Sequence, residues 1–343
     1  MKVIDLRSDT VTLPTHAMYE AMVAAPLGDD VLGHDPTAQR LEALAARKLG
    51  KEAALFTASG TMSNLLAMLS HCQRGDEVIV GSEAHILHFE TGGAFALGGL
   101  GLRTVANDPQ GRLDPTELRL ALRRGDLNSP ATALICLENT HNRCGGTVLS
   151  EEDLAPAVQV AEEWRLPVHL DGARIFNASA ALGAPVERLT AGAESVCFSL
   201  CKGLACPVGS VLCGSAEFIE RARRFRKMLG GGMRQAGVLA AAGIVALGGM
   251  VERLAEDHRN AQLLAQGLAS LPGVSLSPWP QSNLVFFIVQ GWDPAVFVRE
   301  CAAQDLLCLD EGGRIRMVTH NDIARADVEA AVERVGAVLK RAA

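Results

Sequence analysis

The sequence predicts an α/β fold with a large domain, residues 1–250, that has a mainly parallel sheet flanked by helices. A smaller C-terminal α+β domain, residues 251–343, is expected to follow. Over the first two thirds of the chain, short apolar segments alternate with amphipathic segments, and this alternation indicates a parallel sheet covered by helices. After Gly232 the sequence becomes helix-rich and then shows a short α+β pattern. We therefore place the domain boundary near Val251.

Capping residues and apolar runs locate the individual elements. Asp35 and Pro36 suit the N-cap and first position of a helix, and Gly50 suits its end. Strands are expected at 53–57, 77–80, 132–138, 168–171, 195–200, 209–213, 283–289 and 314–318. Helices are expected at 61–72, 151–164, 216–229 and from 322 to about 341.

Composition and charge limit the class of partner. Hydrophobic residues make up 48% of the chain and charged residues 21%, which is ordinary for a soluble protein with a large core. The formal net charge of -7 argues against nucleic acid or an anionic membrane surface as the main partner. The longest apolar stretch, residues 237–251, is short for a bilayer span, so we expect a buried core helix.

The start of the chain and the cysteines predict a cytoplasmic location. Asp5 and Arg7 interrupt the first seven residues before the apolar run of a secretory signal could form. The nine cysteines include no Cys-x-x-Cys pair, which favours reduced thiols. Four of them lie in apolar, strand-like sequence and are expected to be small buried hydrophobes rather than metal ligands; they are Cys197, Cys201, Cys206 and Cys213.

A phosphate-binding helix start is expected at Ser59, Gly60 and Thr61. These residues lie between an expected strand and an expected helix, so backbone N–H groups and the positive end of the helix dipole point to one place. The sequence matches neither a P-loop nor a dinucleotide-binding fingerprint. Taken alone, these residues favour a capped helix start without a ligand.

Two ionisable side chains follow expected strands of the sheet. Asp171 comes directly after the apolar run 168–170, at the sheet edge where open α/β folds bind ligands. Lys202 follows the run 196–201, and burial there would lower the pKa of its amine and make it a usable nucleophile. The alternatives are a salt bridge between Asp171 and Arg174 and a lysine that reaches solvent.

Together these features suit pyridoxal 5'-phosphate. The helix start would bind the phosphate, Asp171 would keep the pyridine nitrogen protonated, and Lys202 would form a Schiff base. The order of the three features along one α/β domain makes this interpretation stronger than any of them alone.

The chain resembles the low-specificity L-threonine aldolases, which are fold type I pyridoxal-phosphate lyases with an aspartate aminotransferase-like fold. Several motifs carry the resemblance, in order from near the first residue almost to the last. They are DLRSDTVT (5–12), GDDV (28–31), ENTHN (138–142), HLDGARIFN (169–177), SLCKGL (199–204), GGGMRQ (230–235) and RMVTH (316–320).

The resemblance implies a role for each matching residue. Lys202 matches the Schiff-base lysine, Asp171 the partner of the pyridine nitrogen, and His85 the histidine that stacks on the cofactor ring near the substrate hydroxyl. Gly60 and Thr61 match the phosphate site, and Ser59 is expected to bind the cofactor with them. Three residues match the group that binds the substrate carboxylate: Ser8, Arg174 and Arg316. Arg174 is also expected to contact the cofactor.

The resemblance also implies sites shared between subunits. Lys227 and Arg234 match basic residues that reach a neighbouring subunit's site, so we expect at least a homodimer and most simply a homotetramer. Two positions expected near the substrate side chain depart from many relatives. Asn128 stands where some relatives have histidine, and Leu32 where many have an aromatic residue, which leaves the threo/erythro preference open.

The expected activity is pyridoxal-phosphate-dependent retro-aldol cleavage of L-threonine, L-allo-threonine and related substrates such as phenylserine, which yields glycine and an aldehyde. Another fold type I enzyme, such as an aminotransferase or a β-eliminating lyase, is the alternative, and a non-catalytic binding protein is a further one. The roles of some residues stay open. His85 and His88 could be surface histidines or part of a metal site, Arg316 could lie with Arg314 on a solvated strand face, and His141 is as consistent with a structural as with a catalytic role.

Overall fold

A seven-stranded sheet, with strand order β2-β8-β7-β6-β5-β3-β4, forms the centre of the larger unit. Strand β8 runs antiparallel to its neighbours β2 and β7, and the remaining neighbouring pairs are parallel. The computed structural model describes residues 2–341, and the mainly parallel sheet expected from the sequence is confirmed. The strands are β2 (Ala53–Thr57), β3 (Glu77–Gly81), β4 (Gly101–Val105), β5 (Thr132–Glu138), β6 (Val168–Asp171), β7 (Ser195–Ser199) and β8 (Ser210–Gly214).

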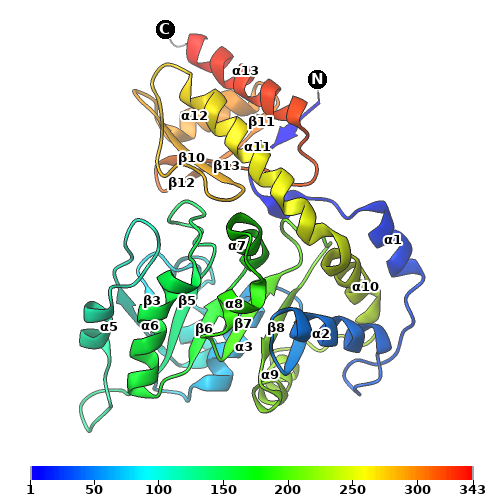
Figure 1. The fold of residues 1–343 in the computed structure, drawn as a ribbon, viewed down its shortest axis with the longest axis vertical. Coiled ribbons are helices and arrows are strands. Elements are labelled where there is room, and N and C mark those ends of the chain that lie inside the picture. Colours follow the sequence, from blue (N-terminus) through cyan, green and yellow to red (C-terminus); the bar gives the residue numbers. More distant parts are fainter. Residues whose placement is uncertain (1, 342–343) are drawn as a thin grey trace.

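Helices cover both faces of this sheet (Figure 1). In β5, Ile135 and Leu137 face one apolar core, whereas Leu134 and Cys136 face another. A strand buried on both faces needs an apolar residue at nearly every position, which explains the continuous apolar runs in the sequence. The helices of this unit are α2 (Pro36–Lys48), α3 (Gly60–His71), α4 (His85–His88), η2 (Ala94–Gly98), α5 (Pro115–Ala121), α6 (Glu151–Trp164), α7 (Ile175–Leu182), α8 (Val186–Thr190) and α9 (Ala216–Met228).

Helix α2 has the cap that the sequence predicts. The Asp35 carboxylate accepts hydrogen bonds from the backbone N–H groups of Thr37 and Ala38, at 3.1 and 2.9 Å. Pro36 takes the first helical position, where its missing N–H costs nothing. Gly50 has a φ of 63°, a left-handed conformation that glycine adopts readily after a helix.

One long helix connects the larger unit to the smaller one. It is continuous from Gly237 to Ala269 and consists of α10 (Gly237–Val245), η3 (Ala246–Met250) and α11 (Val251–Ala269). By length and composition alone it could cross a membrane, a property shared by core helices. Leu254 belongs to the core of the larger unit, and Leu264 to that of the smaller unit. The boundary expected near Val251 falls inside this helix and stays a prediction.

The smaller unit is built on a four-stranded antiparallel sheet with the order β12-β13-β10-β9. The chain's first strand, β1 (Ile4–Asp5), pairs in parallel with β11 (Leu306–Leu307), and Ile4 and Leu6 lie in this unit's core. The N-terminal segment then passes to the larger unit through η1 (Asp9–Val11) and α1 (His16–Val23). The other elements are β9 (Val274–Leu276), β10 (Leu284–Val289), α12 (Pro294–Ala302), β12 (Leu309–Glu311), β13 (Arg314–Val318) and α13 (Arg325–Arg341).

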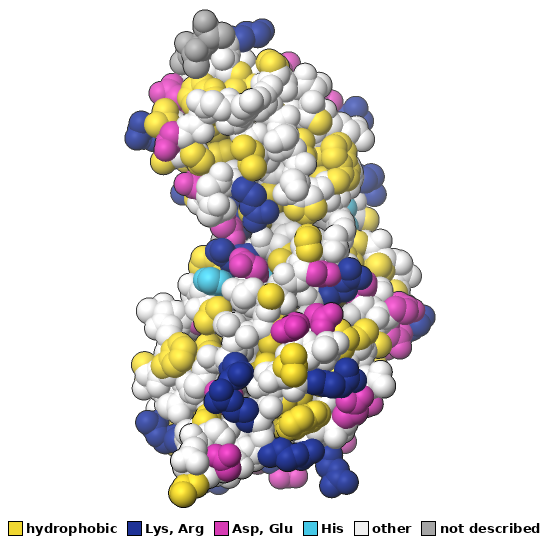
Figure 2. Space-filling model, turned by 90° about the vertical axis from the view of Figure 1, so that its left-hand side faces the viewer, with side chains coloured by type: hydrophobic (Ala, Val, Ile, Leu, Met, Phe, Trp, Pro, Cys, Tyr) yellow, Lys and Arg dark blue, Asp and Glu magenta, His cyan; other side chains and the backbone are white. Residues whose placement is uncertain are grey.

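The molecule narrows where the two units meet. Figure 2 shows this waist from the side, with basic, acidic and histidine side chains gathered on it. The carboxyl ends of β5 and β6 carry Glu138 and Asp171, and a ligand site is expected at such an edge of an open α/β sheet.

Candidate active site

An open pocket with an empty volume of about 730 Å³ lies between the two units. It is lined by residues of the larger unit, by the N-terminal segment, and by β12 and β13 of the smaller unit. Five of the residues that the sequence singled out line it together: Ser8, His85, Arg174, Lys202 and Arg316. Side chains scattered over more than 300 positions of the chain therefore converge on one space.

Lys202 presents a free amine to this pocket. It follows β7, and its backbone carbonyl accepts a hydrogen bond from the N–H of Ala205 at 2.8 Å in a tight turn. Within residues 2–341, Nζ makes no hydrogen bond or ion pair. Burial lowers the pKa of the amine, and the charge of Arg174 lowers it further, although Asp9 and Asp171 oppose the shift. The lowered pKa makes the amine a better nucleophile at neutral pH.

Asp171 is buried at the end of β6 and is held as a carboxylate. Its Oδ2 accepts a hydrogen bond from Asn64 Nδ2 at 2.8 Å, and its Oδ1 accepts one from the backbone N–H of Ala173 at 3.1 Å. Burial would raise the pKa of Asp171, but the charges of His85 and Lys202 and the Asn64 hydrogen bond lower it overall. A buried anion of this kind can hold the proton of an aromatic nitrogen.

His85 opens the short helix α4, and two acids hold it. Its backbone N–H donates to Glu138 Oε2 at 2.7 Å, and its ring Nδ1 lies 3.1 Å from Glu90 Oε1. Burial would lower the pKa of His85, but the hydrogen bond to Glu90 and the charges of Asp171, Glu90 and Glu138 raise it. The ring of His88 instead contacts the carbonyl of Ser82 at 2.7 Å.

The start of α3 has the geometry expected of an anion site. Ser59 is the N-cap, and its side chain accepts a hydrogen bond from the N–H of Met62. A Cβ added at Gly60 would come within 3.4 Å of Ser199 Oγ, which places this helix start beside the end of β7. Thr61 is exposed. The helix start therefore lies next to the strand that leads to Lys202.

Arg174 and Asp9 form a buried pair beside the pocket. Arg174 Nε and Nη2 donate to the two carboxylate oxygens of Asp9, both at 2.7 Å. Asn142 and Asn283 extend the network, since Arg174 Nη1 lies 3.4 Å from Asn142 Oδ1 and Asn283 Nδ2 donates to Asp9 at 3.2 Å. Burial would raise the pKa of Asp9, but the charge and hydrogen bonds of Arg174 hold it well below its usual range.

Arg316 is the second buried guanidinium and has an unused donor. Its Nη1 donates to Glu311 Oε2 at 2.8 Å, whereas its buried Nε has no hydrogen-bond partner. Burial and the nearby charge of Arg174 lower its pKa. Two neighbouring cations with a donor to spare favour an anionic ligand such as a carboxylate.

Eight predicted site residues do not line this pocket. Four of them, Asp171 and the residues Ser59 to Thr61, are described above, and the other four lie elsewhere. Asn128 is exposed, and it precedes the amino end of β5, whereas the pocket is at the carboxyl ends. Leu32 is 64% exposed in the turn after Asp29. The expectation that Asn128 and Leu32 lie near the pocket is therefore wrong for the pocket of their own chain. Lys227 lines a separate basic pocket with Arg223, Arg224 and Arg226, and Arg234 pairs with Asp29 at 2.9 Å.

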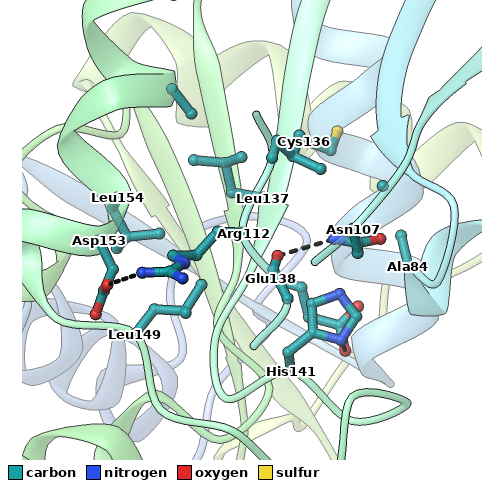
Figure 3. A pocket seen from close by; sticks show the side chains of 14 residues that line it. Ala84, Asn107, Arg112, Cys136, Leu137, Glu138, His141, Leu149, Asp153 and Leu154 are labelled. Carbon is teal, nitrogen blue, oxygen red and sulfur yellow. Dashed lines mark hydrogen bonds and ion pairs between the residues drawn. The ribbon is translucent and has the colours of Figure 1, made fainter. Parts of the chain in front are cut away.

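His141 lines a small, partly enclosed pocket rather than the one that contains Lys202. Figure 3 shows it beside Glu138 and Asn107. The imidazole is 1% exposed, its Nδ1 has no hydrogen-bond partner, and that atom lies 4.0 Å from Glu138 Oε1. The pocket is lined mostly by apolar residues, and the polar groups beside His141 suit a buried water molecule, so the geometry favours a structural role for His141.

Several residues of the site were missed by sequence reasoning. They act through other residues or come from short segments without periodicity, and no motif marks them individually; they are Asp9, Asn64, Glu90, Asn142 and Glu311. Asp9 and Asn142 do lie inside motifs that carried the family resemblance. Glu311 lies on the three-residue strand β12, which is too short to give a periodic signal.

Comparison with known proteins gives a consistent result. A family model described as β-eliminating lyase matches residues 5–290. The low-specificity L-threonine aldolase 1 of Arabidopsis thaliana is 46% identical over 336 residues, which cover 96% of this chain and 94% of that protein. The low specificity L-threonine aldolase of Escherichia coli (strain K12) is 45% identical over 322 residues, with coverages of 94% and 95%.

A solved threonine aldolase structure from Leishmania major superposes with a TM-score of 0.83 at 20% identity, covering 97% of this chain and 98% of that one. This likeness confirms the fold that the resemblance implied. The family match and the extent of identity lead to the same assignment. The chain is an enzyme that belongs to the β-eliminating lyase family and, within it, to the family of the low-specificity L-threonine aldolases.

Proposed function

We propose that this enzyme cleaves the Cα–Cβ bond of L-threonine, L-allo-threonine and related β-hydroxy-α-amino acids such as phenylserine. The products are glycine and an aldehyde. One observation carries the proposal beyond family membership: a free lysine amine with a lowered pKa faces two buried guanidinium groups across one pocket. This arrangement binds an amino acid by its carboxylate and presents its α-carbon to the amine side of the site.

The residues present fit pyridoxal 5'-phosphate as the cofactor. Ser59, Gly60 and Thr61 would hold the phosphate at the start of α3, Asp171 would face the pyridine nitrogen, and Lys202 would bind the cofactor covalently through its amine. When bound, the cofactor supplies an electron sink for the electrons released by bond cleavage. Arg174, which is held by Asp9, closes the pocket on the side of the substrate carboxylate.

The protein's own groups choose which bond breaks. Arg174, Arg316 and Ser8 would hold the substrate carboxylate and so fix the orientation of the α-carbon. Fixed orientation is worth several orders of magnitude in rate and selects the bond that breaks. His85, which is proposed to stack on the cofactor ring, would take the proton of the β-hydroxyl group, directly or through water.

The proposed assembly is a homotetramer in the cytoplasm, with sites shared between subunits. Lys227 and Arg234 support this proposal, since both are basic residues that do not line the pocket of their own chain. Arg234→Ala should weaken retention of the cofactor, and dilution to monomers should weaken it too. A monomer that keeps its cofactor as firmly as the assembled protein would contradict the shared site.

Product analysis tests the proposed reaction. The purified protein is mixed with L-threonine, L-allo-threonine and phenylserine, and glycine and aldehyde are measured without any added keto acid. Release of both products in equal amounts is expected. A requirement for a keto acid would instead indicate an aminotransferase, and formation of 2-oxobutyrate and ammonia from L-threonine without glycine would indicate a β-eliminating lyase.

A further inference from the structure

Glu90 is a buried acid at the back of His85 that the proposed reaction has not used. Its side chain is 4% exposed. Its Oε1 accepts a hydrogen bond from Asn64 Nδ2 at 2.7 Å and lies 3.1 Å from His85 Nδ1. Asn64 Nδ2 donates to Asp171 Oδ2 as well, at 2.8 Å. A continuous chain of short contacts therefore links Asp171, Asn64, Glu90 and His85.

The orientation of the Asn64 amide is fixed by its other contacts. Its Oδ1 lies 3.0 Å from His169 Nε2 and 3.2 Å from Cys197 Sγ, both of which can donate. A flipped amide would place this oxygen between two carboxylates, which offer it no donor. Asn64 therefore serves both Asp171 and Glu90 with N–H groups, and both acids are held as acceptors.

An accepting Glu90 decides where the imidazole carries its proton. Burial and the charge of Asp171 raise the pKa of Glu90, whereas its contacts with His85 and Asn64 oppose the shift. The oxygen that faces the ring, Oε1, is the one that accepts from Asn64. An ionised carboxylate has no hydrogen to donate, so the ring nitrogen that faces this oxygen, His85 Nδ1, must donate. A neutral imidazole has one N–H and one lone pair, which leaves the lone pair on Nε2. Within residues 2–341, Nε2 makes no hydrogen bond, and the ring lines the pocket that contains Lys202.

We propose that Glu90 is a positioning residue: held by Asn64, it fixes the His85 ring with its proton on Nδ1 and presents Nε2 to the pocket as the basic nitrogen. The inference rests on the proposed function, in which His85 accepts the proton of the substrate hydroxyl. The same contact stabilises the imidazolium that forms after proton transfer, as a carboxylate does behind a catalytic histidine.

Other charged groups around His85 affect the same nitrogen. Burial would lower its pKa, whereas Glu90, Asp171 and Glu138 raise it. The groups that line the same pocket are Arg174, Lys202, Asp310, Glu311 and Arg316. Among the three acids that raise this pKa, Glu90 is the one whose carboxylate contacts the ring directly. Its removal should therefore have the largest effect on the pKa of His85.

The variant Glu90→Gln keeps the shape of the side chain and removes its charge. The pKa of His85 should fall, so the acid limb of the plot of kcat/KM against pH should move to lower pH by about one unit. The maximum kcat/KM should also fall about 10- to 100-fold, as is usual when a supporting contact is lost. The control is Glu83→Gln, whose carboxylate pairs with Arg143 at 2.8 Å and is 41% exposed. It removes a charge from the same segment and should leave the limb in place.

A second readout needs neither substrate nor cofactor. Protein labelled with ¹⁵N-histidine and freed of cofactor is titrated by NMR, and the His85 signals are identified by their loss in His85→Asn. In the unmutated protein Nδ1 should carry the proton of the neutral ring, and the pKa should be higher than in Glu90→Gln. A proton on Nε2, or the same pKa in both proteins, would overturn the proposal.

The two readouts separate this inference from the proposed function. If no β-hydroxy amino acid releases glycine, the proposed function fails, but the tautomer of His85 still tests the role of Glu90. If cleavage proceeds and Glu90→Gln has the same acid limb as the unmutated enzyme, Glu90 does not act on His85 and the reaction itself stands. Should Glu90→Gln fail to fold, the tautomer in the unmutated protein decides alone.

Discussion

Asp5 and Asp9 each form a bidentate pair with an arginine, and the burial of the two pairs differs. Asp9 and Arg174 are joined by two hydrogen bonds of 2.7 Å, and their side chains are 0% and 5% exposed. Asp5 and Arg7 are joined by hydrogen bonds of 2.9 and 2.6 Å, but their side chains are 24% and 47% exposed. The same substitution at each aspartate isolates the effect of burial.

Asp9→Asn should destabilise the protein strongly. It leaves the Arg174 guanidinium buried without its counter-charge and next to Arg316, and breaking such a pair typically costs about 3–5 kcal/mol. At ~2.1 cal/mol/K per residue, this loss lowers Tm by roughly 4 to 7 °C for a chain of 343 residues. Asp5→Asn should cost at most about 1 kcal/mol, because exposed pairs contribute little.

Equilibrium unfolding in urea, with the cofactor removed, measures both variants against the unmutated protein. The expected difference between Asp9→Asn and Asp5→Asn is at least about 2 kcal/mol. Asp9→Asn should also weaken glycine binding, since Arg174 loses the contact that orients it. Equal stabilities for the two variants would refute the reasoning that Asp9 holds Arg174 in a buried site.

Three further predictions concern binding, acid stability and selectivity. Arg316→Ala should raise KM for L-threonine at least ~10-fold. The control is Arg314→Ala, which should leave KM unchanged because the Arg314 guanidinium donates to the carbonyl of Arg143. Equal effects of the two substitutions would contradict a carboxylate site at Arg316. Burial lowers the pKa of His71 to about 3 and that of His169 to about 4, so the unfolded chain takes up protons first as the pH falls. The free energy of unfolding should therefore decrease below about pH 6.5, by about 2 kcal/mol per histidine at pH 5. Urea unfolding at pH 7.5 and pH 5 checks this, and equal stabilities at the two pH values would contradict it. Discrimination between L-threonine and L-allo-threonine should be only several-fold, since contacts of about 1 kcal/mol change a rate ratio by that much, and a hundredfold ratio of kcat/KM would contradict it.

Most elements of the fold could be predicted because each has a local signal. The cap of α2 at Asp35 and the apolar strands β5 and β6 are examples, since capping chemistry and continuous apolar runs are visible in the sequence. The pairing of β1 with β11 could not be predicted. It joins two-residue strands about 300 positions apart, and strands this short have no periodicity.

The site was predictable where a residue type is unusual for its place. Asp171 is the last residue of a buried strand and Lys202 follows another, and a charge needs a reason at such places. Glu90, Asn64 and Glu311 act through contacts with other side chains, and such contacts exist only in three dimensions. Sequence reasoning placed Asn128 near the pocket by family likeness, whereas its position before β5 puts it at the opposite edge of the sheet.

The central claim is that Lys202 carries the cofactor. The most direct measurement is to reduce the protein as purified with borohydride, digest it, and find the peptide that bears the reduced pyridoxyl group by mass spectrometry. The account predicts a modified Lys202 in the unmutated protein and no stable adduct in Lys202→Ala. A modified residue elsewhere, such as Lys227, or an unchanged adduct in Lys202→Ala would contradict it.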